Sequence, residues 1–259
     1  DHRVRRVYVA LPLDDAPRIK ALHESLLDEH VDVIWAPDIF GLELVNHRVT
    51  ELGGIPLIAL SETPLLGANA VLERTEDICL SALMLLAAAP VMLAVAAGVK
   101  LTSPGPVLHR QRRIGWNGRA FEMLKFRSMP VDAEADGVEW GNAEGKPVTR
   151  LGAFLRRTSL DELPQLFNVL AGSMSLVGPR PERPELIERF REDWRGYMLR
   201  QHVKAGMTGW AQVNGLRGNT SLRKRLQFDL FYIRNWSVMF DVKILALTVV
   251  RGFVHRNAH

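Results

Sequence analysis

The stretch ICLSALMLLAAAPVMLAVAAGV, residues 78–99, decides what kind of fold this chain can adopt. It contains no charged residue, and a helix of this length is long enough to span the hydrocarbon core of a bilayer. Pro90 interrupts it, and a proline removes a backbone donor and kinks a helix. Three interpretations are open: a buried core helix, a membrane-spanning helix, or a re-entrant helix over 78–100 that enters and leaves on one side.

Charges on both flanks bear on that choice. From Lys100 to Arg127 the chain carries seven Lys and Arg residues against one acid, Glu122. Such an excess is typical of cytoplasmic segments, and the α/β pattern before the stretch also indicates a cytosolic segment. Both flanks on one side favour re-entry with the bend at Pro90. The residues alone leave the re-entrant and spanning interpretations about equally supported.

Residues 1–68 predict a partial, Rossmann-like α/β module. Helical spacing over 17–30 separates apolar runs that predict strands at 7–11, 31–35 and 55–60. Strands that alternate with helices are typical of a parallel sheet. The first strand leads into Pro12-Leu13-Asp14-Asp15, without the glycines of a dinucleotide-binding turn, so a structural or regulatory role is favoured. The chain starts without Met, and we expect it to be the later part of a longer protein.

Residues 69–259 predict a mainly helical, membrane-embedded catalytic domain. The net charge of +4 fits an anionic surface or phosphorylated substrates. Nucleic acid is disfavoured as a partner because the basic residues flank an apolar membrane segment. The single cysteine, Cys79, excludes an intrachain disulfide and a cysteine metal site. Residues 238–254 are apolar but carry three charges, which fits either a helix in the membrane interface or an ordinary core helix.

Two adjacent acids, Asp161 and Glu162, lie among apolar residues in TSLDELPQLFN, residues 158–168. A buried carboxylate needs a cation, hydrogen bonds or a metal. In a phosphoryl-transfer site, one carboxylate can attack or bind Mg²⁺ while the other positions groups or exchanges a proton. The alternative is a helix start, capped by Thr158 or Ser159, in which the acids complement the helix dipole. The pair taken alone favours the helix start.

Other polar residues could bind a phosphorylated substrate. Arg180 lies between two prolines that fix its backbone, and a guanidinium matches phosphate oxygens in a bidentate way. The alternative is a rigid loop whose arginine pairs with Glu182. Gln212 and Asn214 lie in the glycine-containing stretch 206–215, which can approach a base or sugar closely or form a structural turn. Further cations are Arg112, Arg113, Lys125, Arg127, Arg156 and Arg157.

The order of these pieces resembles the bacterial sugar transferase family, the monotopic phosphoglycosyl transferases that start exopolysaccharide and capsule assembly. The resemblance runs from about residue 70 to the end, and undecaprenyl-phosphate glucose phosphotransferases are the most similar subgroup. Residues 38–48 resemble the soluble module of larger members, in which four transmembrane helices come first. The likeness lies in residues 125–129, 156–168, 173–182 and 206–215.

The resemblance implies that a UDP-sugar and undecaprenyl phosphate react to give a polyprenyl-diphospho-sugar and UMP. Asp161 would be the nucleophile that forms a covalent phosphosugar intermediate and binds Mg²⁺ together with the diphosphate, and Glu162 would be its partner. The re-entrant helix becomes preferred, although Ala89 stands where the family often has serine before the proline of Pro90. The residues expected to bind phosphate or substrate are Arg156, Arg180, Lys125, Arg127, Gln212 and Asn214.

The resemblance also implies the location and partners. We expect the catalytic domain on the cytoplasmic face of the inner membrane, in contact with membrane lipid, and a homodimer is kept as a candidate assembly. Glucose 1-phosphate is the expected group, with galactose 1-phosphate as the alternative. A membrane-anchored regulatory or scaffold protein is a second class of function. A transferase that uses Glu162 alone as a general base is a third.

Overall fold

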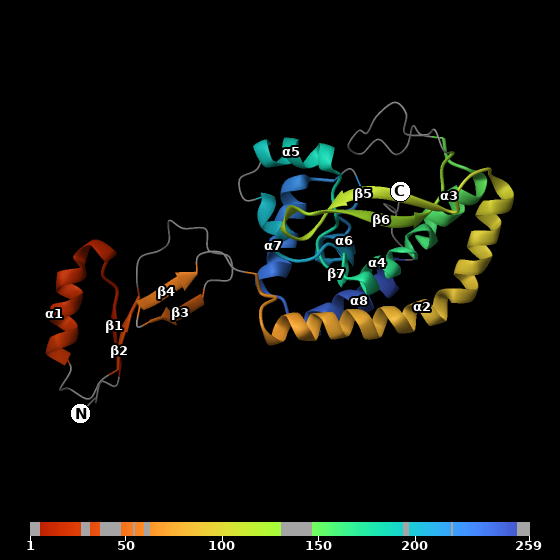
Figure 1. The fold of residues 1–259 in the computed structure, drawn as a ribbon. Helices are drawn as coiled ribbons and strands as arrows, with labels where there is room; N and C mark the ends of the chain where they lie inside the picture. Colours follow the sequence, from red (N-terminus) through yellow and green to blue (C-terminus); the bar gives the residue numbers. More distant parts are fainter. Residues whose placement is uncertain are drawn as a thin grey trace. The chain divides into compact units, whose positions relative to one another are not determined.

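The computed structural model describes residues 6–26, 32–36, 48–53, 55–59, 63–130, 147–193, 197–218 and 220–252. The chain divides into two compact units, residues 1–61 and 62–259. Helices and strands are mixed in the order shown in Figure 1, so the predicted α/β class is correct at that level.

The first unit starts with a strand, a helix and a second strand. Strand β1 (Arg6–Val9) leads through a 3₁₀ turn, η1 (Leu13–Asp15), into helix α1 (Ala16–Leu26). Strand β2 (Asp32–Trp35) then pairs with β1 in parallel. A parallel pair joined by a helix is the unit that the alternating pattern predicted.

The prediction of a third parallel strand at 55–60 is wrong. Strand β4 (Ile55–Ala59) pairs antiparallel with β3 (Arg48–Leu52), a strand that the sequence analysis missed. The register pairs Leu52 with Ile55, and Gly53, directly after β3, has a φ of 58°. In the sequence, Gly53-Gly54 stands between the two apolar runs. Two glycines between apolar runs are a strong hairpin signal. In the described residues the strands form separate pairs, so a Rossmann-like sheet is not confirmed.

The second unit is built along helix α2 (Ala68–Thr102), which contains the apolar stretch. The helix is long and apolar enough to cross a membrane by length and composition, and most of its apolar part is exposed. Leu83, Leu86 and Leu93 are 63%, 76% and 72% exposed, which rules out the core-helix interpretation. Figure 1 shows α2 changing direction along its length, and Pro90 is the proline inside this helix. Pro90 therefore bends one continuous helix, and the re-entrant path stays a prediction.

The start of α2 is attached to the rest of its unit by charged groups. Arg74 donates to the carbonyls of Val169 (2.7 Å) and Leu170 (2.6 Å), at the C-terminal end of helix α4 (Gln165–Ala171), where carbonyls lack partners from a following helical turn. Asp77 accepts from the Ser175 hydroxyl at 2.9 Å in strand β7 (Ser175–Val177). These contacts fix α2 against α4 and β7.

The end of α2 is attached to a β-hairpin. Strands β5 (Leu108–Ile114) and β6 (Ala120–Phe126) pair antiparallel around a 3₁₀ turn, η2 (Trp116–Gly118). Arg127, directly after β6, donates to the Ser103 and Pro104 carbonyls at 2.8 Å each. An apolar core under this junction is formed by Val95, Val99, Phe126 and Leu155.

Asn168 attaches helix α4 to the edge of β6. Its side-chain amide donates to the Glu122 carbonyl at 2.7 Å and accepts from the Leu124 amide at 2.9 Å. The side chain reproduces the two bonds of a neighbouring strand, so it satisfies backbone groups that would otherwise be buried without partners. Asn168 thereby sets the position of Lys125, the next residue along the strand.

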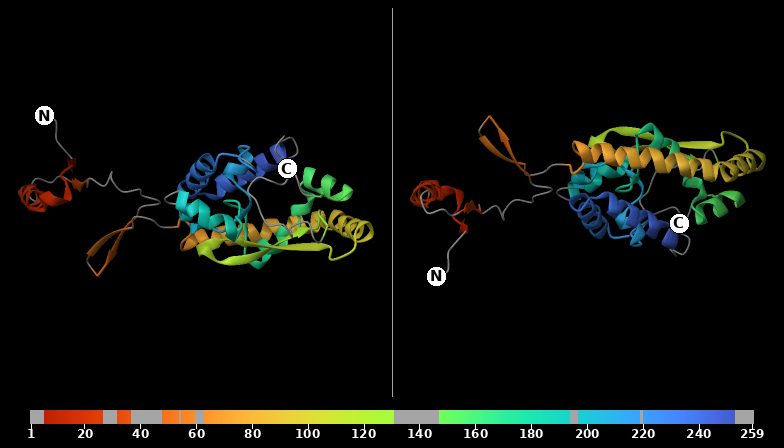
Figure 2. Two further views of the ribbon diagram at one scale, coloured as in Figure 1. Left: turned by 90° about the horizontal axis from the view of Figure 1, so that it is seen from above. Right: turned by 90° about the horizontal axis from the view of Figure 1, so that it is seen from below.

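The remaining elements complete the unit. Figure 2 shows α7 and α8 on the side opposite the hairpin in both views. The elements are α3 (Arg150–Arg157), η3 (Leu160–Glu162), α5 (Pro184–Asp193), η4 (Tyr197–His202), β8 (Gly206–Thr208), α6 (Trp210–Val213), α7 (Leu222–Arg234) and α8 (Val238–Gly252).

Helix α8 combines features of both interpretations proposed for residues 238–254. Ile244 is fully buried, and the Asp241 carboxylate accepts from the Tyr232 hydroxyl at 2.8 Å and the Trp236 indole at 2.9 Å. Met239 and Val250 are 75% and 69% exposed. One face of α8 therefore belongs to the core, and the other presents apolar side chains outward.

Three glycines in the resembling motifs let backbone pack on backbone beside the parallel pair β7–β8. A Cβ added to Gly206 would lie 2.1 Å from the Gly178 nitrogen, and one added to Gly209 would lie 2.1 Å from the Gly178 oxygen. Any side chain at these positions would displace the chain that leads into Arg180.

We predict that Gly206→Ala destabilises the second unit by more than about 2 kcal/mol, because fixed backbone atoms block the new methyl group. Gly98→Ala is the matched control, since a Cβ there meets only the Leu151 side chain, at 3.1 Å. Thermal unfolding of the detergent-solubilised protein measures both. Equal melting temperatures for the two variants would contradict this account.

Candidate active site

Asp161 and Glu162 lie in the 3₁₀ turn η3, between helices α3 and α4. Neither Thr158 nor Ser159 caps a helix start with its side chain: Thr158 ends α3, and Ser159 adopts a left-handed backbone with a φ of 55°. The side-chain cap that the helix-start interpretation expects is therefore not found, although Ser159 precedes η3 and both acids lie in its first turn. In this turn between two helices, the two carboxylates have different neighbours.

Glu162 is held by two cations. Its Oε1 accepts from Lys125 Nζ and from Arg180 Nη2, each at 2.8 Å. Burial alone would raise the pKa of Glu162, but the charges of Arg180 and Lys125 outweigh burial and hold this pKa well below its usual value. Glu162 is thus ionised at neutral pH, and its side chain links strand β6 to the loop that carries Arg180.

Asp161 is in a different state. Its side chain is buried, 8% exposed, and it makes no hydrogen bond or ion pair with the described residues. Burial, opposed by the charge of Lys125 and reinforced by that of Glu162, raises the pKa of Asp161 to about 6. Asp161 is therefore the reactive candidate of the pair, because its oxygens are free to attack or to bind a metal while Glu162 is occupied.

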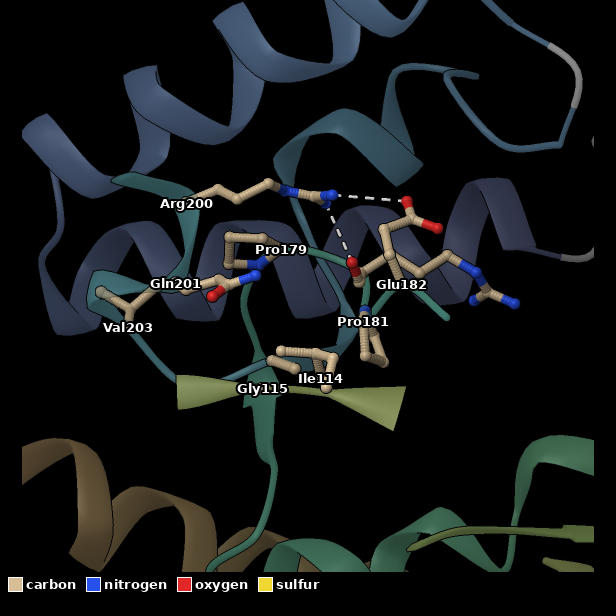
Figure 3. A pocket seen from close by; sticks show the side chains of 10 residues that line it. Ile114, Gly115, Pro179, Pro181, Glu182, Arg200, Gln201 and Val203 are labelled. Atoms are coloured by element: carbon tan, nitrogen blue, oxygen red, sulfur yellow. Dashed lines mark hydrogen bonds and ion pairs between the residues drawn. The ribbon is translucent and has the colours of Figure 1, made fainter. Parts of the chain in front are cut away.

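Arg180 pairs with Glu162 and not with Glu182, the alternative considered from the sequence. The backbone carbonyl of Arg180 accepts from Arg200 Nη2 at 2.9 Å, and Arg200 also pairs with Asp229 at 2.8 Å. Figure 3 shows Arg200 reaching to Glu182 and to this carbonyl, beside Pro179 and Pro181. Arg200 therefore holds the backbone of this loop, and the guanidinium of Arg180 points toward the acidic pair.

A small cavity lies behind this loop (Figure 3). Its lining includes Ile114, Pro181, Arg200 and Gln201, but neither Asp161 nor Glu162. The Gln201 side-chain oxygen is buried without a hydrogen-bond partner among the described residues. The cavity lies among the residues that support the loop, and neither acid of the pair lines it.

Two predicted phosphate-binding cations differ in what they contact. The side chain of Arg156, at the end of α3, makes no hydrogen bond with the described residues, and its positive charge lowers the pKa of Asp161. Arg127 is buried and donates to the carbonyls of Ser103 and Pro104. Arg156 is thus placed beside the acidic pair, whereas Arg127 holds the end of α2.

Gln212 and Asn214 serve the backbone of their own segment. Gln212 is 2% exposed and donates to the Met207 carbonyl at 3.4 Å, and Asn214 donates to the Trp210 carbonyl at 2.7 Å. Trp210 contacts the rings of Phe228, Phe231 and Phe240. These contacts favour the structural-turn interpretation of residues 206–215 over contact with a base or sugar.

Two further arginines lie near the pair: Arg113, one of the cations considered from the sequence, and Arg217, which was not singled out. The pKa of Arg113 is lowered to about 10 by burial and then by the charge of Arg180. Burial and the charge of Arg180 also lower the pKa of Arg217. Arginine is common in this chain, and only the fold shows which copies surround the carboxylates. With Lys125, Arg156 and Arg180 they make the site strongly positive, as a binding site for an anion requires.

The described residues fit Mg²⁺ only in combination with a substrate. They contain no cluster of three or more Asp, Glu, His or Cys residues able to hold a metal ion. Mg²⁺ commonly binds one or two carboxylates together with substrate phosphates and water. Asp161, whose oxygens are free, is the carboxylate that can take that role.

A mostly exposed apolar helix is compatible with a membrane-associated protein, and the adjacent carboxylates with their surrounding cations form a candidate site for an anionic substrate. The bacterial sugar transferase family matches residues 68–255, and the chain belongs to this family, which confirms the resemblance inferred from the motifs.

Curated relatives agree with this assignment. The chain is 48% identical over 262 residues to the UDP-glucose:undecaprenyl-phosphate glucose-1-phosphate transferase of Escherichia coli K12, which covers 99% of this chain and 56% of the relative. It is 43% identical over 266 residues to the Xanthomonas campestris protein of the same name, covering 100% and 55%. The chain thus spans about half the length of these relatives.

A relative with another sugar in its name matches a smaller part. The UDP-N-acetylgalactosamine-undecaprenyl-phosphate N-acetylgalactosaminephosphotransferase of Aeromonas hydrophila is 40% identical over 182 residues, which cover 70% of this chain and 43% of the relative.

The different states of the two acids predict opposite effects on stability. Glu162→Gln would leave Lys125 and Arg180 as buried cations without a partner, and we expect a loss of about 3 kcal/mol. Asp161→Asn would remove a carboxylate that burial disfavours. Because its pKa is raised in the folded state, ionised Asp161 opposes folding, and this cost grows as pH rises from about 4 to about 6.

Melting temperatures of the two variants at pH 7.5 measure the difference. Glu162→Gln should melt below the unsubstituted protein, and Asp161→Asn at or above it. The account fails if Asp161→Asn is the less stable of the two.

Proposed function

We propose that this chain transfers glucose 1-phosphate from UDP-glucose to undecaprenyl phosphate and releases UMP, in the first membrane step of exopolysaccharide assembly. The observation that carries the proposal is the buried, unpaired carboxylate of Asp161 beside a second carboxylate that two cations hold ionised. The names of relatives that match 99–100% of the chain support glucose as the sugar and undecaprenyl phosphate as the acceptor.

In the first step, an oxygen of Asp161 attacks the phosphorus that bears the sugar. The bond between this phosphorus and the bridging oxygen breaks, and UMP leaves with the electron pair. The product is an acyl phosphate in which the sugar 1-phosphate is attached to Asp161. A carboxylate is a known nucleophile for such covalent catalysis.

In the second step, a phosphate oxygen of the lipid attacks the same phosphorus. The bond to Asp161 breaks, its carboxylate is regenerated, and the polyprenyl-diphospho-sugar forms. No general base is needed when both nucleophiles are already anions. This favours a two-step transfer over a mechanism in which Glu162 acts as a general base, because Lys125 and Arg180 hold the pKa of Glu162 well below its usual value and make it a poor proton acceptor.

The cations supply most of the electrostatic stabilisation. Arg180 and Arg156 border the acidic pair and can bind the diphosphate oxygens as charge develops on the leaving group. Mg²⁺, bound by Asp161 and the diphosphate, would neutralise further charge on the phosphates. Asn168 positions Lys125, which holds Glu162, and Arg127 holds the end of α2.

The attachment of α2 supports a re-entrant path. Arg74 near its start and Ser103 just after its end are both bonded to one compact catalytic unit. A spanning helix would place its ends on opposite sides of the membrane, which one compact unit cannot occupy. We therefore propose that α2 enters and leaves on the cytoplasmic face of the inner membrane, with Pro90 at the bend and lipid around its exposed leucines.

The reaction is tested by measuring UMP release from a panel of UDP-sugars by the detergent-solubilised protein with Mg²⁺, with and without undecaprenyl phosphate. We expect UDP-glucose to be the best donor, and Asp161→Asn to lower the rate at least about 1,000-fold. A phosphosugar adduct on Asp161, found by intact mass after incubation without lipid, would identify the two-step path.

Other outcomes select the alternatives. UDP-galactose as the best donor would replace glucose with galactose. An unchanged rate in Asp161→Asn would reject the proposed chemistry. No turnover by folded protein with any donor would favour the regulatory or scaffold class.

The membrane path is tested with single cysteines at Ala68 and Leu101 in a Cys79→Ser background. A membrane-impermeant thiol reagent should label both from the cytoplasmic side of inverted vesicles, and neither in intact spheroplasts. A cysteine at Leu86, whose side chain is 76% exposed in the apolar part, is the control and should resist labelling from both sides. Labelling of positions 68 and 101 from opposite sides would establish a spanning helix.

A further inference from the structure

We propose that Arg217 is a second phosphate-binding arginine of the site, which contacts a substrate phosphate group next to Arg180. The inference rests on the proposed function and adds a substrate-binding residue to it. Neither the sequence motifs nor the acidic pair pointed to this residue.

The fold brings the turn that carries Arg217 to the loop that carries Arg180. The turn follows α6 and is bounded by Gly215 and Gly218, with φ values of 80° and 62°. The Gly218 carbonyl accepts from Arg225 Nη2 at 2.7 Å, and Arg225 Nη1 pairs with Glu182 Oε1 at 3.1 Å. Arg225 is therefore a bridge between the turn and the segment two residues after Arg180.

Arg217 lacks the partners that its burial calls for. Its side chain is half-buried, its Nε is fully buried without a hydrogen-bond partner, and it makes no ion pair with the described residues. Burial and then the charge of Arg180 lower the pKa of Arg217, and the charge of Glu162 opposes them, as expected for a guanidinium near both. A buried cation without a partner is costly, and an anionic ligand would compensate it.

The existing carboxylates do not supply this compensation. Glu162 already shares its charge between Lys125 and Arg180, and Glu182 pairs with Arg200 and Arg225. A phosphate group fits the fork of donors on a guanidinium and brings the missing negative charge. The diphosphate of the donor and the phosphate of the lipid both offer this chemistry.

The test compares Arg217→Gln with Arg223→Gln, a matched control on the exposed side of α7. One readout is the rise in melting temperature that UDP causes in the detergent-solubilised protein. The other is KM, measured separately for UDP-glucose and for undecaprenyl phosphate. We expect Arg217→Gln to raise one KM by about tenfold or more, while Arg223→Gln leaves both unchanged.

The two sources of phosphate give different results. A higher KM for UDP-glucose with a smaller UDP-induced rise assigns Arg217 to the donor diphosphate. A higher KM for undecaprenyl phosphate with an unchanged UDP-induced rise assigns it to the acceptor. Unchanged KM values and an unchanged UDP-induced rise in Arg217→Gln would overturn the inference.

A structural role would give a different pattern. Because Arg217 is a cation without a partner, its removal should leave the melting temperature without ligand unchanged or higher. A lower temperature with unchanged KM values would overturn the inference. If Arg217→Gln does not fold, Arg217→Met gives the same comparison. Absence of UMP release by the unsubstituted protein would instead refute the proposed function, and the UDP-induced rise would still test Arg217.

Discussion

The pairing of Glu162 with Lys125 and Arg180 is the interaction on which the rest of this site depends. It joins three segments that are distant in sequence: strand β6, the turn η3 and the loop after β7. Two cations on one carboxylate leave a surplus of positive charge, which is the condition for binding a diphosphate. The same pairing occupies Glu162 and leaves Asp161 free, so a single ion-pair cluster assigns different roles to two adjacent acids.

A second charged cluster supports the first from behind. Arg200, Glu182, Arg225 and Asp229 are all buried and paired with one another, and Arg200 also binds the Arg180 carbonyl. Buried ion pairs are weak sources of stability but hold groups in specific positions. Here they orient the loop between Pro179 and Pro181, where the backbone is already restricted by the prolines. The glycines packed beside β7 and β8 remove the remaining freedom of this segment.

The sequence predicted the elements with strong local patterns. The uncharged run 78–99, the prominence of Asp161 and Glu162 and the rigid presentation of Arg180 could be read directly from the residues. Long-range pairing could not be read in the same way. Gly53-Gly54 was overlooked as a hairpin signal, the partner of Glu162 depended on which of many cations the fold brings close, and Gln212 is polar but buried. Arg127 and Lys125 also look equivalent in sequence, yet their contacts give them different tasks.

The positions of Lys125 and Arg127 along the chain explain their different contacts and relate the site to helix α2. Lys125 and Arg127 are two residues apart and flank the buried Phe126, so they leave the strand on the same face. Lys125 reaches Glu162, whereas Arg127 reaches the carbonyls that follow α2. At the other end of α2, Asp77 binds β7, which leads into the Arg180 loop. Both ends of the apolar helix are thus within a few residues of groups that hold Glu162. Under the proposed function, this arrangement fixes the reacting carboxylate relative to the bilayer, where a lipid phosphate and a soluble nucleotide sugar must meet.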